Sequence, residues 1–281
     1  MLSLTPKELA IPELHQYLLG AVGPRPICFA STIDAQGNHN LAPFSFFNVF
    51  SAKPPIAIFS PNLSGKTGKA KDTHLNIKEV PECVINIVNY KMVHQMSLAS
   101  SPYAKGVSEF TKAGFTAIAS DLIKPMRVKE SPVQLECKVF ELKEIGNCNL
   151  VFCEIVKIHI DEAVLDATKK IDQQKIDLVA RMGGNWYCRA HGDALFEIEK
   201  PITTFGVGVD SIPNAIRNST VLTGNNLGQL GNIEIMPTPE EIENYTKTAS
   251  SKFTGETEKH QYAKTLLEAN KVKDAWCVLL G

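Results

Sequence analysis

The chain has 281 residues, of which 44% are hydrophobic and 21% are charged, and its net charge is −1 because 29 basic residues nearly balance 30 acidic ones. This length and apolar fraction predict a folded protein with one large core or two small ones. The balanced charge, without a long basic run, argues against a nucleic-acid-binding or membrane-surface protein. We therefore expect small-molecule partners or self-association.

The N-terminal segment MLSLTPKELAIPELHQYLLG has no basic stretch leading into an apolar run, and nowhere do about 18 apolar residues follow one another. We expect neither secretion nor a membrane span. The seven cysteines form no C-x-x-C pair and have mostly apolar neighbours. This pattern indicates neither a zinc site nor a disulfide framework, so we expect reduced, buried thiols in a cytoplasmic protein.

The first predicted element is a helix with Thr5 as its N-cap, Pro6 in its first turn and Glu8 completing a capping box, and it ends at Gly20. Two β-rich runs follow, at 24–33 and 38–51, joined by the short turn sequence DAQG. This pattern predicts an antiparallel hairpin. Proline 43 in the second run has no N–H to donate, which predicts a sheet edge or a bulge.

Further strands are predicted at 55–60, 83–89, 133–145 and 150–160, and the last two form a second hairpin through the turn GNCN. The segment 97–115 is predicted as a short helix, a loop and a short helix, with a proline and a glycine as breakers. Antiparallel hairpins with few intervening helices predict a mainly β barrel or sandwich rather than a doubly wound sheet.

The pattern changes near residue 200, which predicts a domain at 1–200 and a helical extension at 201–281 that packs on the barrel or at a dimer interface. An independent C-terminal domain is the alternative. The elements predicted there are a short helix at 211–219, a Gly/Asn-rich loop at 224–232, a helix that opens with Thr238, Pro239 and Glu241 as a capping box, and a final helix at 257–270.

The stretch GKT at 65–67 is typical of a phosphate-binding nucleotide loop, but Ser60 stands where that loop needs its first glycine. Hydroxyls and lysines around the start of the predicted helix THLNIKEV, with Asp72 or Thr73 as cap, instead favour a phosphate monoester. A solvated lysine loop is the alternative. The residues concerned are Ser60, Ser64, Lys66, Lys69, Lys71 and Thr73.

Small and hydroxylated residues occupy the two strands before this stretch. They would let a flat ring system lie against the backbone, and their hydroxyls and amides would bond its heteroatoms. The alternative is that the phenylalanines form a barrel core and the serines face water. The small and polar residues are Ala30, Ser31, Thr32, Asn40, Ala42 and Ser45, and the phenylalanines are Phe44, Phe46, Phe47 and Phe50.

Four spaced motifs, P-R-P (24–26), S-T-x-D-x-x-G (31–37), N-x-A-P-F-S-F-F (40–47) and K-D-T (71–73), strongly resemble the flavin reductase-like, FMN-binding split-barrel family. The stretches GVSEFTKAGF and GGNWYCR, followed by LFEI, are also similar, so that the resemblance covers roughly residues 20–200. The segment VDSIPNAIRNSTVLTGNNLGQLGN is similar to the tail of a longer, flavoredoxin-like bacterial branch.

The resemblance implies a six-stranded antiparallel Greek-key split barrel with peripheral helices, a homodimer, and one FMN per protomer near the interface. The residues it assigns to the isoalloxazine and ribityl chain are Ser31, Thr32, Asn40, Ala42, Ser45 and Phe46. Those it assigns to the phosphate end are Ser60, Lys71, Asp72 and Thr73.

On the substrate side, His94, Phe110, Tyr187 and Arg189 are placed near the nicotinamide or the acceptor. Structural roles are the alternative for each, such as strand-end packing and an ion pair for Tyr187 and Arg189. The motifs contain no carboxylate pair or Ser/His/Asp arrangement and indicate no metal, and hydride transfer requires no side-chain acid or base.

The function that follows is a flavin reductase in which NAD(P)H transfers hydride to flavin N5. The acceptor would be a small molecule or a partner monooxygenase. Two alternatives stay open: a flavin-binding electron carrier without turnover, and a related barrel that binds haem or pyridoxine phosphate.

Overall fold

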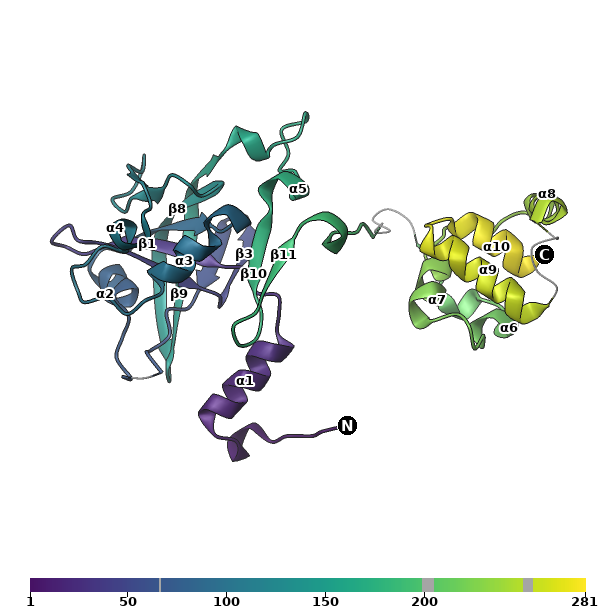
Figure 1. Ribbon diagram of the computed structural model, residues 1–281, viewed down its shortest axis with the longest axis horizontal. Coiled ribbons are helices and arrows are strands. Elements are labelled where there is room, and N and C mark those ends of the chain that lie inside the picture. The colour runs from purple at the N-terminus through teal and green to yellow at the C-terminus, as the bar shows by residue number, and fades with distance from the viewer. Residues whose placement is uncertain (66, 199–204, 250–254) are drawn as a thin grey trace. The chain divides into compact units, whose positions relative to one another are not determined.

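The computed structural model describes residues 1–65, 67–198, 205–249 and 255–281 (Figure 1). Lys66 and the boundary predicted at residue 200 lie outside the described residues. The chain divides into two compact units, Met1–Phe196 and Glu197–Gly281, which we call the sheet unit and the helical unit and describe separately.

The sheet unit is built on one seven-stranded antiparallel sheet (Figure 1). Its strands are β1 (Cys28–Ile33), β2 (His39–Phe44), β3 (Phe47–Ala52), β4 (Pro55–Phe59), β5 (Glu82–Ile87), β8 (Val133–Ile145) and β9 (Cys148–Ile160). They follow the order β2-β1-β5-β8-β9-β4-β3. Both predicted hairpins, β1–β2 and β8–β9, are confirmed. Pro43 lies on the edge strand β2, as its missing donor predicts.

The antiparallel sheet is as predicted, but the predicted six-stranded split barrel differs from the structure. The sheet has seven strands, because the run at 38–51 forms two, and it is not closed into a barrel among the described residues. β2 and β3 lie at opposite edges of the sheet, and only Ser45 and Phe46 separate them in the chain. So short a link keeps the end of β2 close to the start of β3, but no ladder among the described residues joins the two strands. On β2, Pro43 has no N–H, and the Leu41 N–H donates to Glu109 Oε2 at 2.9 Å rather than to a strand.

Helices and short strands surround this sheet, as predicted in outline. The helices are α1 (Ile11–Ala21), α2 (Asp72–Glu79), α3 (Val93–Ala99), α4 (Glu109–Ala113) and α5 (Gln173–Ile176), with 3-10 turns η1 (Pro6–Glu8), η2 (Tyr90–Met92), η3 (Glu162–Val164) and η4 (Gly192–Ala194). The short strands pair as β6 (Ala117–Ile118) with β7 (Arg127–Val128), and β10 (Leu178–Arg181) with β11 (Tyr187–Ala190).

Two predicted helix starts need correction. Thr5 precedes only the turn η1 and makes no side-chain cap bond, because Leu9 and Ala10 are extended and delay α1 until Ile11. The N-cap of α2 is Lys71, one residue before the predicted cap, and it too caps with no side-chain hydrogen bond.

The sheet has an apolar cluster on each face of β1, because successive strand residues point to opposite sides. Cys28 and Ala30 belong to one cluster, which includes Phe59 and Val151. Phe29 belongs to the other, where α3 and α4 pack on β2. The five buried cysteines are Cys28, Cys83, Cys137, Cys153 and Cys277, and all seven cysteines are free thiols.

The helical unit consists of η5 (Val209–Ser211), α6 (Asn214–Arg217), α7 (Gly224–Gly231), α8 (Pro239–Ala249), α9 (Glu256–Glu268) and α10 (Val272–Leu280). Its core is centred on Trp276, which is fully buried and donates through Nε1 to Leu230 O at 3.0 Å. The capping box of Thr238 and Glu241 at the start of α8 is confirmed.

The loop predicted at 224–232 is wrong, since most of it forms α7. Thr223 and Asn226 close a capping box at its start, and Leu230 buries its side chain against the core of the unit. These contacts outweigh the low helix propensity of the glycines and asparagines. Whether the helical unit packs on the sheet unit or at a dimer interface stays a prediction.

Backbone segments cross closely inside the helical unit. Val207 N donates to Ile233 O at 2.8 Å, and Gly208 N donates to Gly231 O at 3.0 Å. A Cβ added at Gly206 would overlap Gly231 O and lie 2.9 Å from Asn232 Cα. Position 206 therefore has room only for glycine. Across the described residues of both units, no helix combines the length and apolarity needed to cross a membrane.

Candidate functional site

A pocket of about 160 Å³ opens where Ile27, just before β1, and the end of β2 face α3 and the β10–β11 hairpin. Its lining mixes apolar side chains with three serines, a tyrosine and an arginine. The lining residues are Ile27, Pro43, Phe44, Ser45, Met96, Ser97, Ser100, Arg181 and Tyr187. Apolar walls combined with converging polar groups are a common feature of small-molecule sites.

Arg25, from the P-R-P motif, joins the elements around this pocket. Its guanidinium donates to Leu19 O at 2.7 Å and Val22 O at 2.6 Å, at the C-terminal end of α1, and to Met182 O at 2.9 Å. Its Nε lies 3.5 Å from Ser45 Oγ. Burial lowers the pKa of this nearly inaccessible arginine, and the charge of Arg181 lowers it further. The motif therefore has a positioning role.

The second group of predicted residues meets at the N-terminal end of α2. Asn40 Nδ2 donates to Thr73 Oγ1 at 2.8 Å and lies 3.4 Å from Thr32 Oγ1, which also accepts from Asn76 Nδ2 at 3.2 Å. All four side chains are buried. Their bonds fix the first turn of α2 against β1 and β2, so the S-T, N-x-A-P and K-D-T motifs form one structural assembly.

The first turn of α2 has the features of an anion site. No side chain caps it, so its leading N–H groups and the positive end of the helix dipole remain available. Lys71 is exposed and Asp72 is half-buried at this turn. This donor set fits a phosphate monoester, since amides and a lysine supply positive potential. The pocket and this turn are joined by the short strands β1 and β2.

Other predicted residues lie apart from both groups. Ser60 is buried, donates to Asn149 O at 3.0 Å and bonds Asn62 Oδ1, so that it ties β4 to β9. Ser31 Oγ is fully buried and has no hydrogen-bond partner in the described part of the chain. Ala42 is half-buried and pairs with Ala30 in the ladder.

The phenylalanines of 44–50 are divided between core and surface. Phe44 and Phe47 pack against the cluster that contains Cys28, whereas Phe46 and Phe50 are 42% and 64% exposed. The core interpretation therefore holds for the first pair, and the second pair is available to a ligand or a partner.

Of the four substrate-side residues, the structure places one at the pocket. Tyr187 lines it and lies under the guanidinium of Arg181, which is 4.5 Å from the ring centroid. Arg189 forms a two-point ion pair with Asp177, at 2.7 and 2.8 Å, and also stacks on Tyr90. This pairing lowers the pKa of Asp177.

The remaining two are on the helices that cover β2. His94 is exposed on α3, and Phe110 is 4% exposed in the apolar cluster under α4. The sequence interpretation also missed pocket residues, namely Arg181, Met96, Ser97 and Ser100. The i, i+3 spacing of Ser97 and Ser100 was a signal that they share one helix face.

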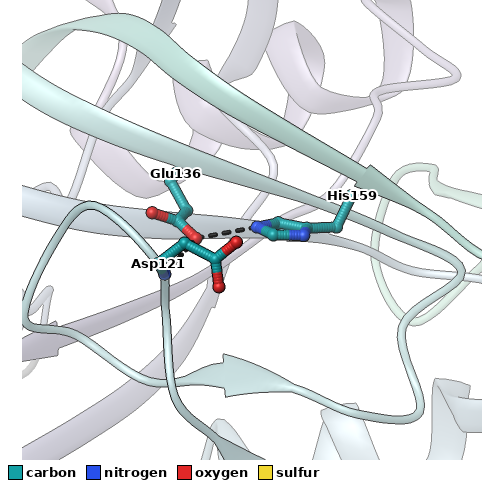
Figure 2. A group of neighbouring side chains, drawn as sticks. All are labelled: Asp121, Glu136 and His159. Carbon is teal, nitrogen blue, oxygen red and sulfur yellow. Dashed lines mark hydrogen bonds and ion pairs between the residues drawn. The ribbon is translucent and has the colours of Figure 1, made fainter.

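Figure 2 shows a second polar cluster, Asp121, Glu136 and His159, whose ligand atoms lie within 4.8 Å of one another. Glu136 is fully buried and accepts from the N–H groups of Asp121 and Leu122 at 2.7 Å each, and its Oε1 lies 2.7 Å from His159 Nε2. Lys157 pairs with Asp121. Backbone donors and a lysine already occupy these oxygens, so the cluster anchors a loop.

Comparison with known proteins places these features in context. The model of a family described as "Flavin reductase like domain" matches residues 21–175. An uncharacterized protein of Aquifex aeolicus is 33% identical over 192 residues, which are 68% of this chain and 97% of that protein. The uncharacterized protein YwrF of Bacillus subtilis is 31% identical over 189 residues, which are 65% of this chain and 91% of that protein.

The chain is also similar to solved structures. Nitrilotriacetate monooxygenase component B from Bacillus cereus has a TM-score of 0.65 at 27% identity, covering 70% of this chain and 98% of its own. A 2-nitrobenzoate 2-nitroreductase of Pseudomonas fluorescens has a TM-score of 0.65 at 26% identity, covering 74% and 100%. Flavoredoxin of Desulfovibrio vulgaris, at 20% identity and a TM-score of 0.56, shares the fold.

Proposed function

The chain belongs to the flavin reductase-like domain family, and on that premise we propose that it is an FMN-binding oxidoreductase that uses NADH or NADPH. The observation that carries the proposal is the buried network of Thr32, Asn40 and Thr73. It fixes the uncapped first turn of α2 beside the strands that carry the other family motifs.

The residues we assign to FMN fall into two sets. The amides of the first turn of α2, with Lys71, would hold the phosphate, and Asp72 and Thr73 shape that turn. The half-buried strand residues Ala42 and Ser45 and the exposed Phe46 would lie along the ring and the ribityl chain. Thr32, Asn40, Ser31 and Ser60 are buried, and we assign them the support of this surface rather than contact through exposed side chains.

When bound, FMN supplies the redox chemistry by accepting at N5 the hydride that leaves C4 of the nicotinamide. The protein's own groups position the flavin and the nucleotide and shield them from water. Arg25 holds β10 and the end of α1 beside Ser45. The apolar wall of Ile27, Phe44 and Met96 limits water in the pocket where the donor or the acceptor would lie.

We also propose a homodimer. Val49 and Phe50 on β3 and Phe140 on β8 are 51%, 64% and 58% exposed, and contact between two copies would remove such apolar side chains from water. A sedimentation-velocity measurement tests the proposal, and a monomer at micromolar concentration contradicts it. The electron acceptor is a small molecule or a partner monooxygenase.

The first experiment is an absorption spectrum of the purified chain with FMN, followed by anaerobic addition of NADH and then NADPH. We expect a two-band flavin spectrum that bleaches with at least one nucleotide. A flavin spectrum that persists would favour the electron carrier, and a chain that takes up no FMN would contradict the proposal. A haem or pyridoxine phosphate spectrum would identify the third alternative.

A variant tests the phosphate end separately. Lys71→Ala removes the exposed cation at the first turn of α2, so we expect FMN to bind about tenfold more weakly in a fluorescence titration. The matched control is Lys143→Ala, an exposed lysine on β8. Equal FMN affinity of the two variants would contradict the assignment of the phosphate to α2.

A further inference from the structure

Two arginines face each other across the strand pair beside the pocket. Arg25 N donates to Arg181 O, and Arg181 N donates to Arg25 O, both at 2.9 Å. Residues that exchange both bonds in an antiparallel pair carry their side chains on the same side of the sheet. Two like charges in this position repel each other, and the charge of Arg181 contributes to the lowered pKa of Arg25.

The charge of Arg25 is balanced within the protein, but that of Arg181 is not. Arg25 donates to three backbone carbonyls, two of them at the negative end of α1. Arg181 has one carbonyl partner, Gly184 O at 2.6 Å, and the ring of Tyr187. Among the described residues, the arginines paired with carboxylates are Arg127 and Arg189. Arg181 therefore brings an uncompensated positive charge to the pocket.

The rest of the lining indicates the size and character of the occupant. The hollow of about 160 Å³ is close to the cavity of about 150 Å³ that admits one benzene ring in an engineered protein. Ile27, Phe44 and Met96 offer an apolar wall to such a ring, while Ser97 and Ser100 offer hydroxyls to its polar substituents.

We propose that this pocket binds an organic anion with a single ring, whose carboxylate or phosphate pairs with Arg181 while the ring lies against the apolar wall. A guanidinium suits this task because its N–H groups match two oxygens of one carboxylate or phosphate group. The inference deepens the proposed function by naming a ligand class for its pocket, and it rests on that function only for the redox role of the ligand. The anion comes either from an acceptor substrate or from the phosphates of the nicotinamide nucleotide.

Calorimetric titration of the full chain with benzoate tests the binding without nucleotide or turnover, so it stands even if the reductase proposal fails. We expect benzoate to bind about 10- to 100-fold more tightly than benzamide, which has the same ring and no charge. Arg181→Gln is expected to remove that preference and leave benzamide affinity unchanged. Lys129→Gln, which removes an exposed positive charge elsewhere on the sheet unit, is the control and should retain it.

Equal affinity for benzoate and benzamide in the unaltered chain, or a preference that survives in Arg181→Gln, would overturn the proposal. The comparison of the two ligands needs no variant, so it decides even if Arg181→Gln does not fold. Competition then identifies the source of the anion. Displacement of benzoate by NADH or NADPH assigns the site to the nucleotide, and simultaneous binding assigns it to an acceptor.

Discussion

Two buried carboxylates hold segments against the sheet by accepting backbone N–H groups. Glu136 on β8 accepts from Asp121 and Leu122, and Glu109 on α4 accepts from Leu41 on the edge strand β2. Both are less than 9% exposed. A buried carboxylate is tolerated only where hydrogen bonds replace its lost hydration, which is what these backbone groups provide.

Glu136→Gln should destabilise the sheet unit by about 1–3 kcal/mol, since an amide presents an NH₂ group where a second backbone donor needs an acceptor. Although burial works to raise the pKa of Glu136, the N–H groups of Asp121 and Leu122 and the His159 ring lower it overall. Its stabilisation is therefore present above the usual glutamate pKa and is lost as pH falls through the lowered value. Urea unfolding at neutral pH measures the effect.

The control for Glu136→Gln is Glu141→Gln, since Glu141 is exposed on the same strand. Equal unfolding free energies of the two variants would show that Glu136 does not anchor the 121–122 loop.

Glu109 should contribute a pH dependence of stability opposite in sign to that of Glu136, and Glu109→Gln should remove it. Burial raises the pKa of Glu109, the Leu41 N–H opposes that shift, and the charge of Asp72 adds to it. The folded chain therefore holds this proton to higher pH than the unfolded chain. Its contribution is greatest below the usual glutamate pKa of about 4.3 and is lost as pH rises through the raised value.

Glutamine still accepts from Leu41 but does not titrate, so the variant should lose this decline in stability. Unfolding at a series of pH values checks it, with Glu154→Gln, an exposed position on β9, as the control. An unchanged pH profile in Glu109→Gln would contradict the argument.

For single residues, the sequence predicts which motif residues lie together better than it predicts what each of them bonds. The motifs group Thr32, Asn40 and Thr73 around one ligand, and the three do lie together, although they bond one another. Arg181 was missed, because its position at the pocket depends on the pairing of β10 with the segment around Arg25, far away in the chain. Local patterns carry no information on such a pairing.

Among the elements, sequence patterns predict strands more reliably than the way they close a sheet. Alternation and turn residues identified the β1–β2 and β8–β9 hairpins. They did not separate β2 from β3, because residues 38–51 are β-rich throughout and the break at Ser45 depends on the course of the whole sheet. For α7, tertiary contacts override a glycine-rich sequence.

The close crossing inside the helical unit gives a test at the level of elements. Gly206→Ala should destabilise this unit by about 1–3 kcal/mol, since the added Cβ overlaps the backbone at Gly231 and neither segment has room to move freely. Gly228→Ala is the matched control. An added Cβ there meets nothing within 4 Å, and alanine should stabilise α7 slightly. Thermal unfolding followed by Trp276 fluorescence, in chains that also carry Trp186→Phe, measures both, and similar midpoints would contradict the steric argument.

At the scale of the whole molecule, each unit has its own core and one of the two tryptophans. Trp186 of the sheet unit is 77% exposed, whereas Trp276 of the helical unit is fully buried. A core of this kind, closed by helix contacts within residues 197–281, is what an autonomous unit requires.

We therefore expect the fragment 197–281 to unfold cooperatively on its own, with the emission of buried Trp276 shifting to longer wavelength. The full chain carrying Trp186→Phe gives the comparison, because Trp276 is then its one tryptophan. A higher midpoint in the full chain would support packing of the helical unit on the sheet unit or at a dimer interface. A fragment without a cooperative transition would contradict its autonomy.

The pocket beside Arg181 draws its lining from both ends of the sheet unit, from Ile27 to Tyr187. During translation, Arg25 and Ile27 leave the ribosome on the order of ten seconds before Arg181 and Tyr187. Through that interval Arg25 lacks the Met182 carbonyl, and the wall formed by Phe44 is exposed to other polypeptide chains. The pocket is thus completed only when synthesis of the sheet unit is nearly over. A nascent chain that stalls before residue 181 exposes the apolar wall of an incomplete pocket.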